Sequence, residues 1–277
     1  MKSVLPWLRS DVRAVVSIGV LVLLCVLALA APVVSPYPPN DQDLTATLLH
    51  PSAAHPLGTD DLGRDVLSRL VWGARSSLYA SVLAVTIAVL IGVPVGLVAG
   101  LGGRWADIGI SRAIDALLSF PGIVLAVGVT GVLGVGLTNG MVAVGITFSP
   151  QLARLVRSRT LVGRHELYVD AARVYNASPL RIALRHVLPN AMPPVIVQVT
   201  LLLAGALLAE ASLSFLGLGV QAPAVSWGAM LARAYNYMDV APLQMYPPGI
   251  AVLVTALAFN ALGDSLRTLL DPTARRT

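Results

Sequence analysis

The sequence has few charged residues and almost no lysine. Of its 277 residues, 12% are charged and 56% are hydrophobic, and Lys2 is the only lysine. Soluble domains carry roughly 25% charged residues, so this composition argues against an ordinary soluble domain. A phosphate-binding loop of the form GxxxxGK[ST] requires a lysine within it, and the sequence contains no such segment. The chain therefore does not hydrolyse ATP by that route.

Further absences argue against an enzyme and against a metal protein. Cys25 is the only cysteine, so no internal disulfide can form, and its apolar surroundings favour a small hydrophobic residue over a redox role. No histidine and cysteine residues have zinc-site spacing, and no serine lies in a GxSxG turn. His50 and His55 lie in a proline-rich segment, where loop histidines are a simpler interpretation than metal ligands. We expect no catalytic residue, no metal site and no cofactor bound by this chain.

Long uncharged stretches make up most of the sequence, and the mean hydropathy is +0.78. A membrane-spanning helix needs about 20 mostly apolar residues. Residues 116–153 are long enough for two helices, with a turn near Gly134 and Gly136. A cleaved signal peptide is the alternative for the first apolar run, which exceeds the usual length of about 7–15 residues. The prediction is an all-α integral membrane protein with six transmembrane helices, near residues 15–34, 78–99, 116–133, 139–157, 194–213 and 248–268.

Basic residues are distributed unevenly between the two sides of these six helices. One side holds Lys2 and most of the arginines, whereas the other holds only Arg64, Arg69, Arg75 and Arg233. Because cytoplasmic segments carry an excess of basic residues, both termini and the segment 154–190 are predicted to be cytoplasmic. The net charge of +5 follows from this topology and does not indicate nucleic-acid binding.

Residues 154–190 form a polar island between two apolar runs. Two sets of apolar residues in it follow the helical spacing i, i+3, i+4, i+7, at positions 168–175 and 180–187. Asn176 can adopt the left-handed conformation that ends a helix, and Ser178 followed by Pro179 suits the start of the next one. The island therefore predicts a cytoplasmic helix-turn-helix, which favours a docking surface for a soluble partner.

Three segments resemble a known family. Asp170-Ala171-Ala172, Asn176 and the run His186 to Pro189 resemble the EAA…G…I-LP loop of ABC importer permeases, with Asp for Glu, Asn for Gly and His for Ile. Residues 54–78 and 210–231 resemble the outer segments of the dipeptide, oligopeptide and nickel permeases, C-type subunit. The resemblance covers about residues 50–270.

The resemblance implies the fold and the partners. It implies a type I ABC importer transmembrane domain in the bacterial inner membrane, which moves dipeptides or oligopeptides into the cytoplasm. The partners would be a homologous B-type permease, two ATPases that bind ATP and magnesium, an extracytoplasmic peptide-binding protein and membrane lipid. The alternatives are the same machinery carrying nickel or another small solute, a stand-alone secondary transporter or channel, and a membrane anchor without a pathway.

In this family the cytoplasmic loop lies in a groove of the ATPase. The resemblance therefore implies that residues 164–190 couple ATP hydrolysis to the membrane helices, and that small alanines let the two surfaces approach closely. The expected coupling residues are Tyr168, Asp170, Ala171, Ala172, Tyr175, Asn176, Leu188 and Pro189.

The first outer segment, residues 51–77, is predicted to carry a short surface helix that begins near Asp60. Asp61 would pair with Arg64, and Asp65 with Arg69, because these residues lie one helical turn apart. The cluster of Asp60, Asp61, Arg64 and Asp65 has two interpretations, an outer scaffold or a contact with the binding protein.

Glu210 is the one acidic residue within or near a predicted span. Glu210, Ser212 and Ser214 are expected either to line the pathway or to support a re-entrant turn at residues 212–219. The predicted organisation is a first unit at 1–50, the outer helix at 51–77, a permease core at 78–270 that includes the loop 154–190 and the outer segment 212–245, and a tail at 271–277.

Overall fold

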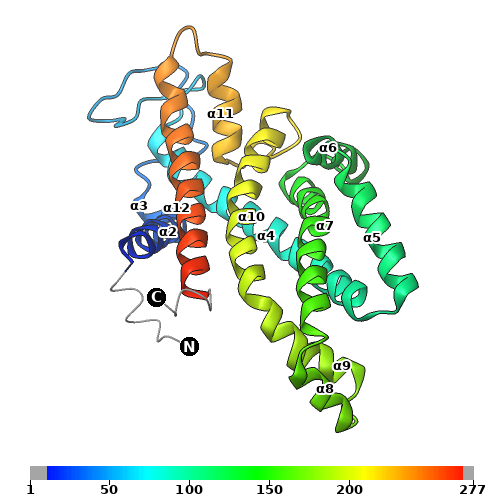
Figure 1. The fold of residues 1–277 in the computed structure, drawn as a ribbon. Helices are drawn as coiled ribbons and strands as arrows, with labels where there is room; N and C mark the ends of the chain where they lie inside the picture. Colours follow the sequence, from blue (N-terminus) through cyan, green and yellow to red (C-terminus); the bar gives the residue numbers. More distant parts are fainter. Residues whose placement is uncertain (1–10, 271–277) are drawn as a thin grey trace.

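The computed structural model describes residues 11–270 as a bundle of helices, and none of these residues forms a strand (Figure 1). The predicted tail 271–277 and the basic residues Lys2 and Arg9 lie outside the described residues. The elements are α2 (Val12–Leu29), α3 (Ala31–Val34), α4 (Val66–Leu101), α5 (Arg104–Leu118), α6 (Gly122–Leu133), α7 (Leu137–Gly163), α8 (Leu167–Val174), α9 (Pro179–Arg181), the π-helix η1 (Ile182–Val187), α10 (Leu188–Phe215), α11 (Trp227–Tyr235), the 3-10 helix η2 (Pro242–Met245) and α12 (Tyr246–Leu270).

The count of candidate membrane-spanning helices does not confirm the prediction of six. Within residues 11–270, four helical runs are long and apolar enough to cross a membrane, and α5 with α6, bent by 94°, would make a fifth. The four are Val12–Leu29, Val66–Leu101, Pro179–Phe215 and Pro242–Leu270. Helix α7, predicted as a span at 139–157, does not belong to this set, although it packs against α4, α5, α6 and α10. A helix surrounded by other helices needs fewer apolar residues than one that faces lipid.

Helix α4 is longer than predicted. It begins at Val66, where Asp65 is the N-cap and accepts a hydrogen bond from the Ser68 backbone nitrogen at 2.7 Å, and it runs without a break to Leu101. The separate surface helix predicted within 51–77 is therefore wrong, because its second half is the first part of the span. Residues 59 and 65 are joined instead by an isolated antiparallel bridge.

Helices α4 and α7 pack closely against each other. A Cβ atom placed on Gly96 would lie 2.6 Å from the Ala153 carbonyl oxygen and 2.6 Å from Val156 Cβ, so only glycine permits this approach. Small residues at such positions allow two helices to approach closely. The main core cluster forms around this contact and includes residues of α4, α7, α8 and α10.

The turn predicted within residues 116–153 is confirmed. Helix α6 ends at Leu133 and α7 begins at Leu137, and Gly134 and Gly136 between them have φ of 92° and 144°. Helix α5 is joined to α7 by two ion pairs, Asp107 with Arg157 and Asp115 with Arg154, each at 2.5 Å.

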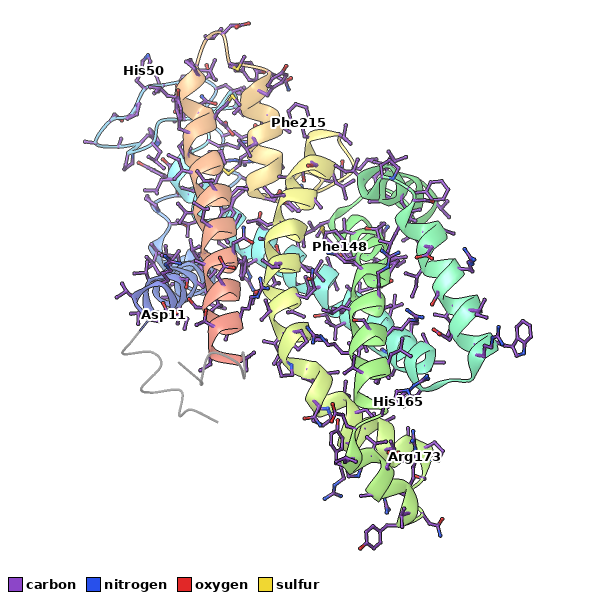
Figure 2. The ribbon with its side chains drawn as sticks, viewed as in Figure 1. Asp11, His50, Phe148, His165, Arg173 and Phe215 are labelled. Atoms are coloured by element: carbon purple, nitrogen blue, oxygen red, sulfur yellow. The ribbon has the colours of Figure 1, made fainter. Side chains whose placement is uncertain are left out.

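The bundle has two distinct ends. Helices α8 and α9 project at one end beyond the other helices, and α11 lies at the opposite end (Figure 1). Figure 2 places His165 and Arg173 at the end that carries α8, and His50 and Phe215 toward the opposite end. We call these the loop end and the far end.

Candidate functional site

The helix-turn-helix of the loop end has the predicted turn. Asn176 has φ of 53°, and the nitrogen of Ala177 donates to the Ala172 oxygen at 3.0 Å while the nitrogen of Asn176 donates to the Arg173 oxygen at 3.0 Å. This pair of bonds is a Schellman motif, which satisfies the last carbonyl groups of α8. Ser178 then accepts a hydrogen bond from the Arg181 nitrogen at 3.3 Å, as expected of an N-cap.

The second helix of the turn is not separate. Helix α9 passes into the π-helix η1 and then into α10, so a single helical column runs from Pro179 to Phe215. Leu188 is half-buried and packs against the main core, and Pro189 is exposed at the start of α10. These two predicted coupling residues therefore lie at the base of the loop and not at its tip.

Helix α8 has an inward face that differs from the predicted stripe. Val169 is completely buried, and Ala172 is only 9% exposed; both pack in the main core with Ile182 and Val187. The prediction of one apolar stripe through Tyr168, Ala171, Ala172 and Tyr175 is therefore wrong, because Ala172 faces the chain's own core. The spacing rule found a helix, but it could not distinguish which of two apolar faces is covered.

The outward face of α8 carries a different apolar row. Leu167, Ala171, Val174 and Tyr175 are exposed, and their spacing of i, i+4, i+7, i+8 puts them on one side of the helix. Leu167 and Val174, exposed by 85% and 82%, were missing from the prediction, although their spacing in the sequence is the signal that identifies them. We call these four residues the α8 row.

Polar side chains flank the α8 row. Asp170 pairs with Arg173 of the same helix at 2.8 Å, and both side chains are about half exposed. Arg173 also donates to the Arg164 carbonyl oxygen at 3.3 Å, and Arg164 donates to the Gly100 carbonyl oxygen at 3.1 Å. These bonds connect α8 to the ends of α7 and α4. Tyr168 lies beside the row and is 37% exposed.

The acidic cluster at the far end is held by ion pairs that the sequence did not predict. Asp60 accepts hydrogen bonds from the Arg64 backbone nitrogen at 3.0 Å and from Arg64 Nε at 2.7 Å. Asp65 lies 3.0 Å from His55 Nδ1. The predicted pairs Asp61 with Arg64 and Asp65 with Arg69 are therefore wrong, because this segment precedes the helix and folds back on other loops.

Asp61 pairs with a residue distant in the sequence. Its two carboxylate oxygens accept hydrogen bonds from Arg233 Nε at 2.5 Å and from Arg233 Nη2 at 2.8 Å. Burial by itself would raise the pKa of Asp61, but the hydrogen bond and the charge of Arg233 outweigh it and lower the pKa of Asp61 below 3.8. This pair joins the segment before α4 to α11.

Glu210 joins three segments of the far end. It is 1% exposed, and its carboxylate accepts hydrogen bonds from the hydroxyls of Ser77 at 3.3 Å, Ser214 at 2.8 Å and Ser226 at 2.7 Å. These serines belong to α4, to the end of α10 and to the N-cap of α11. Ser77 Oγ also accepts from the Trp227 nitrogen at 3.1 Å. Such a network is a connection between helices, and burial of the carboxylate separates it from solvent.

The turn predicted at 212–219 begins later than expected. Ser212 and Ser214 are still helical, because α10 continues to Phe215. The Ser212 hydroxyl donates to the Leu208 carbonyl oxygen at 2.8 Å within the same helix, so Ser212 does not take part in the Glu210 network.

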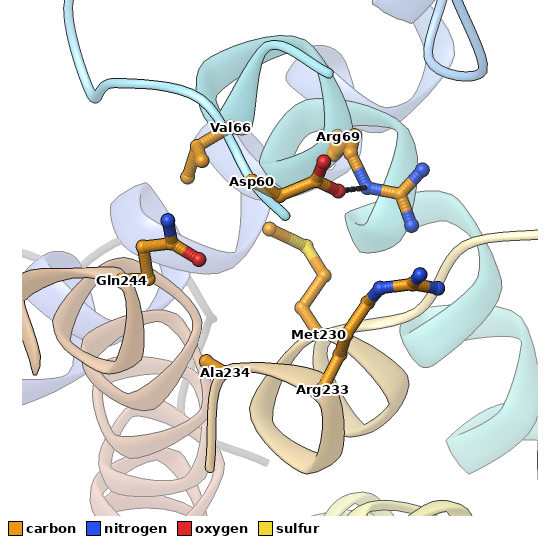
Figure 3. A pocket seen from close by; sticks show the side chains of 7 residues that line it. All are labelled: Asp60, Val66, Arg69, Met230, Arg233, Ala234 and Gln244. Atoms are coloured by element: carbon orange, nitrogen blue, oxygen red, sulfur yellow. Dashed lines mark ion pairs between the residues drawn. The ribbon is translucent and has the colours of Figure 1, made fainter. Parts of the chain in front are cut away.

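A small cavity lies among residues of the segment before α4, the start of α4, α11 and η2 (Figure 3). Its volume is about 20 Å³, and its polar lining consists of Asp60, Arg69, Arg233 and Gln244. Figure 3 shows the guanidinium groups of Arg69 and Arg233 extending to the same side. A cavity of that volume with several polar groups suits one water molecule. Within residues 11–270, no group of three or more His, Cys, Asp or Glu side chains could hold a metal ion.

The fold is that of an ABC importer transmembrane subunit. It is similar to a chain in inward-facing structures of the MetNI methionine ABC transporter, with a TM-score of 0.61 and 21% sequence identity over 73% of this chain and 96% of that one. Residues 92–276 match the family described as binding-protein-dependent transport system inner membrane component, and residues 5–51 match the N-terminal TM domain of oligopeptide transport permease C. The chain belongs to this permease family, and the resemblance seen in the sequence is confirmed.

Close relatives have names that agree with this family. The chain is 40% identical over 276 residues to the dipeptide transport system permease protein DppC of Alkalihalophilus pseudofirmus, with 98% of this chain and 91% of that protein covered. It is 42% identical over 275 residues to the glutathione transport system permease protein GsiD of Pectobacterium atrosepticum, with coverage of 96% and 91%. It is 41% identical over 271 residues to the probable D,D-dipeptide transport system permease protein DdpC of Escherichia coli, with coverage of 98% and 91%. The chain is thus a multi-pass subunit of an inner-membrane transport system.

Proposed function

We propose that this chain is the C-type permease subunit of an ATP-driven importer that moves dipeptides or oligopeptides into the cytoplasm. The names of the relatives support the cargo, since they refer to dipeptides and glutathione, and none of the three refers to nickel. The chain has no phosphate-binding loop of its own, so the energy must come from a partner that hydrolyses ATP and binds magnesium.

The partners follow from the same reasoning. A B-type permease would complete the pathway, two ATPases would dock at the loop end, and an extracytoplasmic peptide-binding protein would deliver the cargo at the far end. The loop end would then be cytoplasmic, as would both termini. The arginines Arg164, Arg173, Arg181 and Arg185 near the α8 row are consistent with that orientation.

The observation that carries the proposal is the α8 row. Exposed apolar side chains on a helix that projects beyond the bundle mark an interaction surface. A helix that presents its apolar face in an i, i+4, i+7 spacing suits a groove in a partner protein. We assign docking to Leu167, Ala171, Val174 and Tyr175, with Asp170 and Arg173 at the border of the contact. Asn176, Leu188 and Pro189 would set the shape of the loop, and Ala172 would anchor α8 to the chain.

The connection from α8 to the bundle indicates how docking would move the membrane helices. Val169 and Ala172 pack against the first turns of the column that continues as α10. Displacement of α8 by an ATPase would therefore displace α10 directly, which is rigid-body gating of a packed helix bundle. At the far end, burial of Asp60, Arg64, Asp65 and Glu210 supports a scaffold role over direct contact with the binding protein or the pathway.

Ala171→Arg tests the docking proposal. Ala171 is exposed, so a long charged side chain there leaves the fold intact and obstructs the docked surface. We expect the variant to assemble in the membrane, to lose co-purifying ATPase subunits and to lose ATP-driven peptide uptake by about tenfold or more, as for a central interface residue. Ser158→Arg, at an exposed position on α7 outside α8, is the matched control. Normal ATPase binding and uptake in the Ala171→Arg protein would overturn the proposal.

A further inference from the structure

The far end holds a second, larger cleft that is rich in arginine. Its volume is about 560 Å³, and it lies between the segment before α4, the segment 214–224 and helix α11. Arg64, Arg69 and Arg233 all line it, whereas Asp61 is the only acidic residue in its lining. A cleft of this size is within the usual range of about 300–1,000 Å³ for small-molecule sites.

The arginines outnumber the carboxylates that neutralise them. Asp61 forms an ion pair with Arg233, and a single oxygen of Asp60 lies 2.6 Å from Nη2 of Arg64 and 3.4 Å from Nε of Arg69. The nearby Asp65 is occupied by His55 and by the N-terminus of α4. Three guanidinium groups thus share two carboxylates, and the lining has an excess of positive charge. Arg64 and Arg69 are each 6% exposed, so water screens this charge only weakly.

The rest of the lining is apolar and aromatic. Phe215 and Tyr235 stack edge to face with ring centroids 5.2 Å apart, and Val220 and Pro223 complete a wall beside them. The cleft therefore combines a planar cationic group, which suits a carboxylate, with a surface that suits an uncharged body. Tyr237 and Asn236 add polar groups at its edge.

We propose that this cleft binds the free carboxylate end of a small solute, with the carboxylate at Arg233 and the rest of the solute against Phe215 and Tyr235. On the proposed function, that solute is the peptide cargo, whose C-terminus is a carboxylate whatever its side chains. The cleft lies at the end opposite the coupling loop, where the cargo would enter. It would give the permease a preference for a free C-terminus, in addition to any selection made by the binding protein.

The test is direct binding to the full chain in lipid nanodiscs, in the complex with which it purifies and without the binding protein. The probes are L-alanyl-L-alanine and its C-terminal amide, titrated at millimolar concentrations by calorimetry. We expect the free acid to bind about tenfold or more tightly than the amide, because the amide lacks charge-assisted hydrogen bonds. Equal affinities, or no binding of the free acid to the wild-type protein, would overturn the proposal.

Two substitutions with opposite expected effects on the affinity for the free acid distinguish a recognition role of Arg233 from a structural one. Arg233→Gln removes the recognising guanidinium and should weaken binding of the free acid by about tenfold. Asp61→Asn removes the competing carboxylate and should strengthen it. Arg75→Gln, an exposed arginine of α4 outside the cleft, should leave the affinity unchanged. A purely structural ion pair predicts that both variants weaken binding, and that result would contradict the proposal.

The ratio of acid to amide binding and the affinities of the variants are measured without ATP hydrolysis or uptake. A negative result in these binding measurements would therefore not bear on the proposed docking of α8. Conversely, normal coupling in the Ala171→Arg protein would not change the ratio of acid to amide binding. If Arg233→Gln does not fold, the acid-to-amide ratio of the wild-type protein and the response of Asp61→Asn still decide the question.

Discussion

At the loop end of the bundle, α8 exposes Leu167 and Val174 to the surroundings; at the far end, Asp60, Arg64 and Glu210 are buried and hydrogen-bonded. Exposed apolar groups cost free energy that only a partner can recover, whereas buried charges cost free energy that only pairing within the chain can recover. The α8 row is therefore uncovered in the described part of the chain, whereas Asp60 and Glu210 have hydrogen-bond partners within it. This difference supports the proposal that the loop end is a surface for another protein and that the buried carboxylates of the far end are a scaffold.

The sharpest test of this comparison uses two valines of one helix. Val169→Asp places a charge in the main core and should destabilise the loop by about 3 kcal/mol or more. Val174→Asp places the same charge on an exposed face and should change stability by less than about 0.5 kcal/mol while ATPase binding is lost. Hydrogen exchange of residues 164–190 and co-purification of the ATPases measure the two effects. Equal loss of hydrogen-exchange protection in both variants would show that neither side of α8 is available to a partner.

Removal of the Glu210 side chain should give the next largest loss of stability. Glu210→Ala leaves the hydroxyls of Ser77, Ser214 and Ser226 without their acceptor, and we expect a loss of about 3 kcal/mol from the free energy of unfolding. Ser212→Ala, in the same helix but outside the network, is the control and should cost under about 0.5 kcal/mol. Thermal unfolding in nanodiscs provides the measurement. Full stability of Glu210→Ala combined with lost uptake would move Glu210 from the scaffold to the pathway.

Two aspartate–arginine pairs, one at each end, give a smaller contrast. Asp61→Ala removes a two-bond pair in which the aspartate side chain is 7% exposed, and should cost about 1–3 kcal/mol. Asp170→Ala removes a pair in which both side chains are about half exposed, and should cost less than about 0.5 kcal/mol. Thermal unfolding of both variants compares them directly. Similar losses would mean that burial does not distinguish the two ends.

The smallest predicted effect is a dependence on pH at the far end. Arg233 lowers the pKa of Asp61 below 3.8 in the folded protein, so the unfolded chain binds a proton at Asp61 more readily. The stability that the pair contributes is therefore complete above about pH 5 and is lost as the pH falls through the folded-state pKa. The free energies of unfolding of the wild-type protein and of Asp61→Asn should differ at pH 7, and the difference should shrink as the pH falls through the folded-state pKa of Asp61. A difference in the free energy of unfolding that stays constant across this pH range would contradict a lowered pKa of Asp61 in the folded protein.

The sequence predicted turns correctly where the turn depends only on the backbone preferences of its own residues. Asn176, Ser178 and Pro179 define a turn through their own backbone preferences, and the structure has that turn. The glycines at 134 and 136 likewise define the break between α6 and α7. The family assignment rested on three such segments and is confirmed.

Features that depend on distant residues were not predictable. The partner of Asp61 is Arg233, 172 residues away, and no spacing rule connects them. The inward side of α8 is decided by Ile182 and Val187 packing against it, so periodicity alone could not assign Ala172 to the core. Helix α7, predicted as a span, is not among the candidate spans, and it packs against α4, α5, α6 and α10, which its own sequence does not indicate.

The helical column from Pro179 to Phe215 connects the loop end of the bundle to the far end. Its 37 residues correspond to about 55 Å, so each degree of tilt about one end moves the other end by about 1 Å. The π-helix at Ile182–Val187 and the prolines Pro193 and Pro194 all lie near the loop end, where helices bend most easily. At the far end, Glu210 joins this column to α4 and α11 by accepting hydrogen bonds from Ser77 and Ser226. If α8 docks as proposed, a displacement of α8 would therefore reach the arginine-lined cleft as a rotation of the column, reduced by any bending at the π-helix and the two prolines.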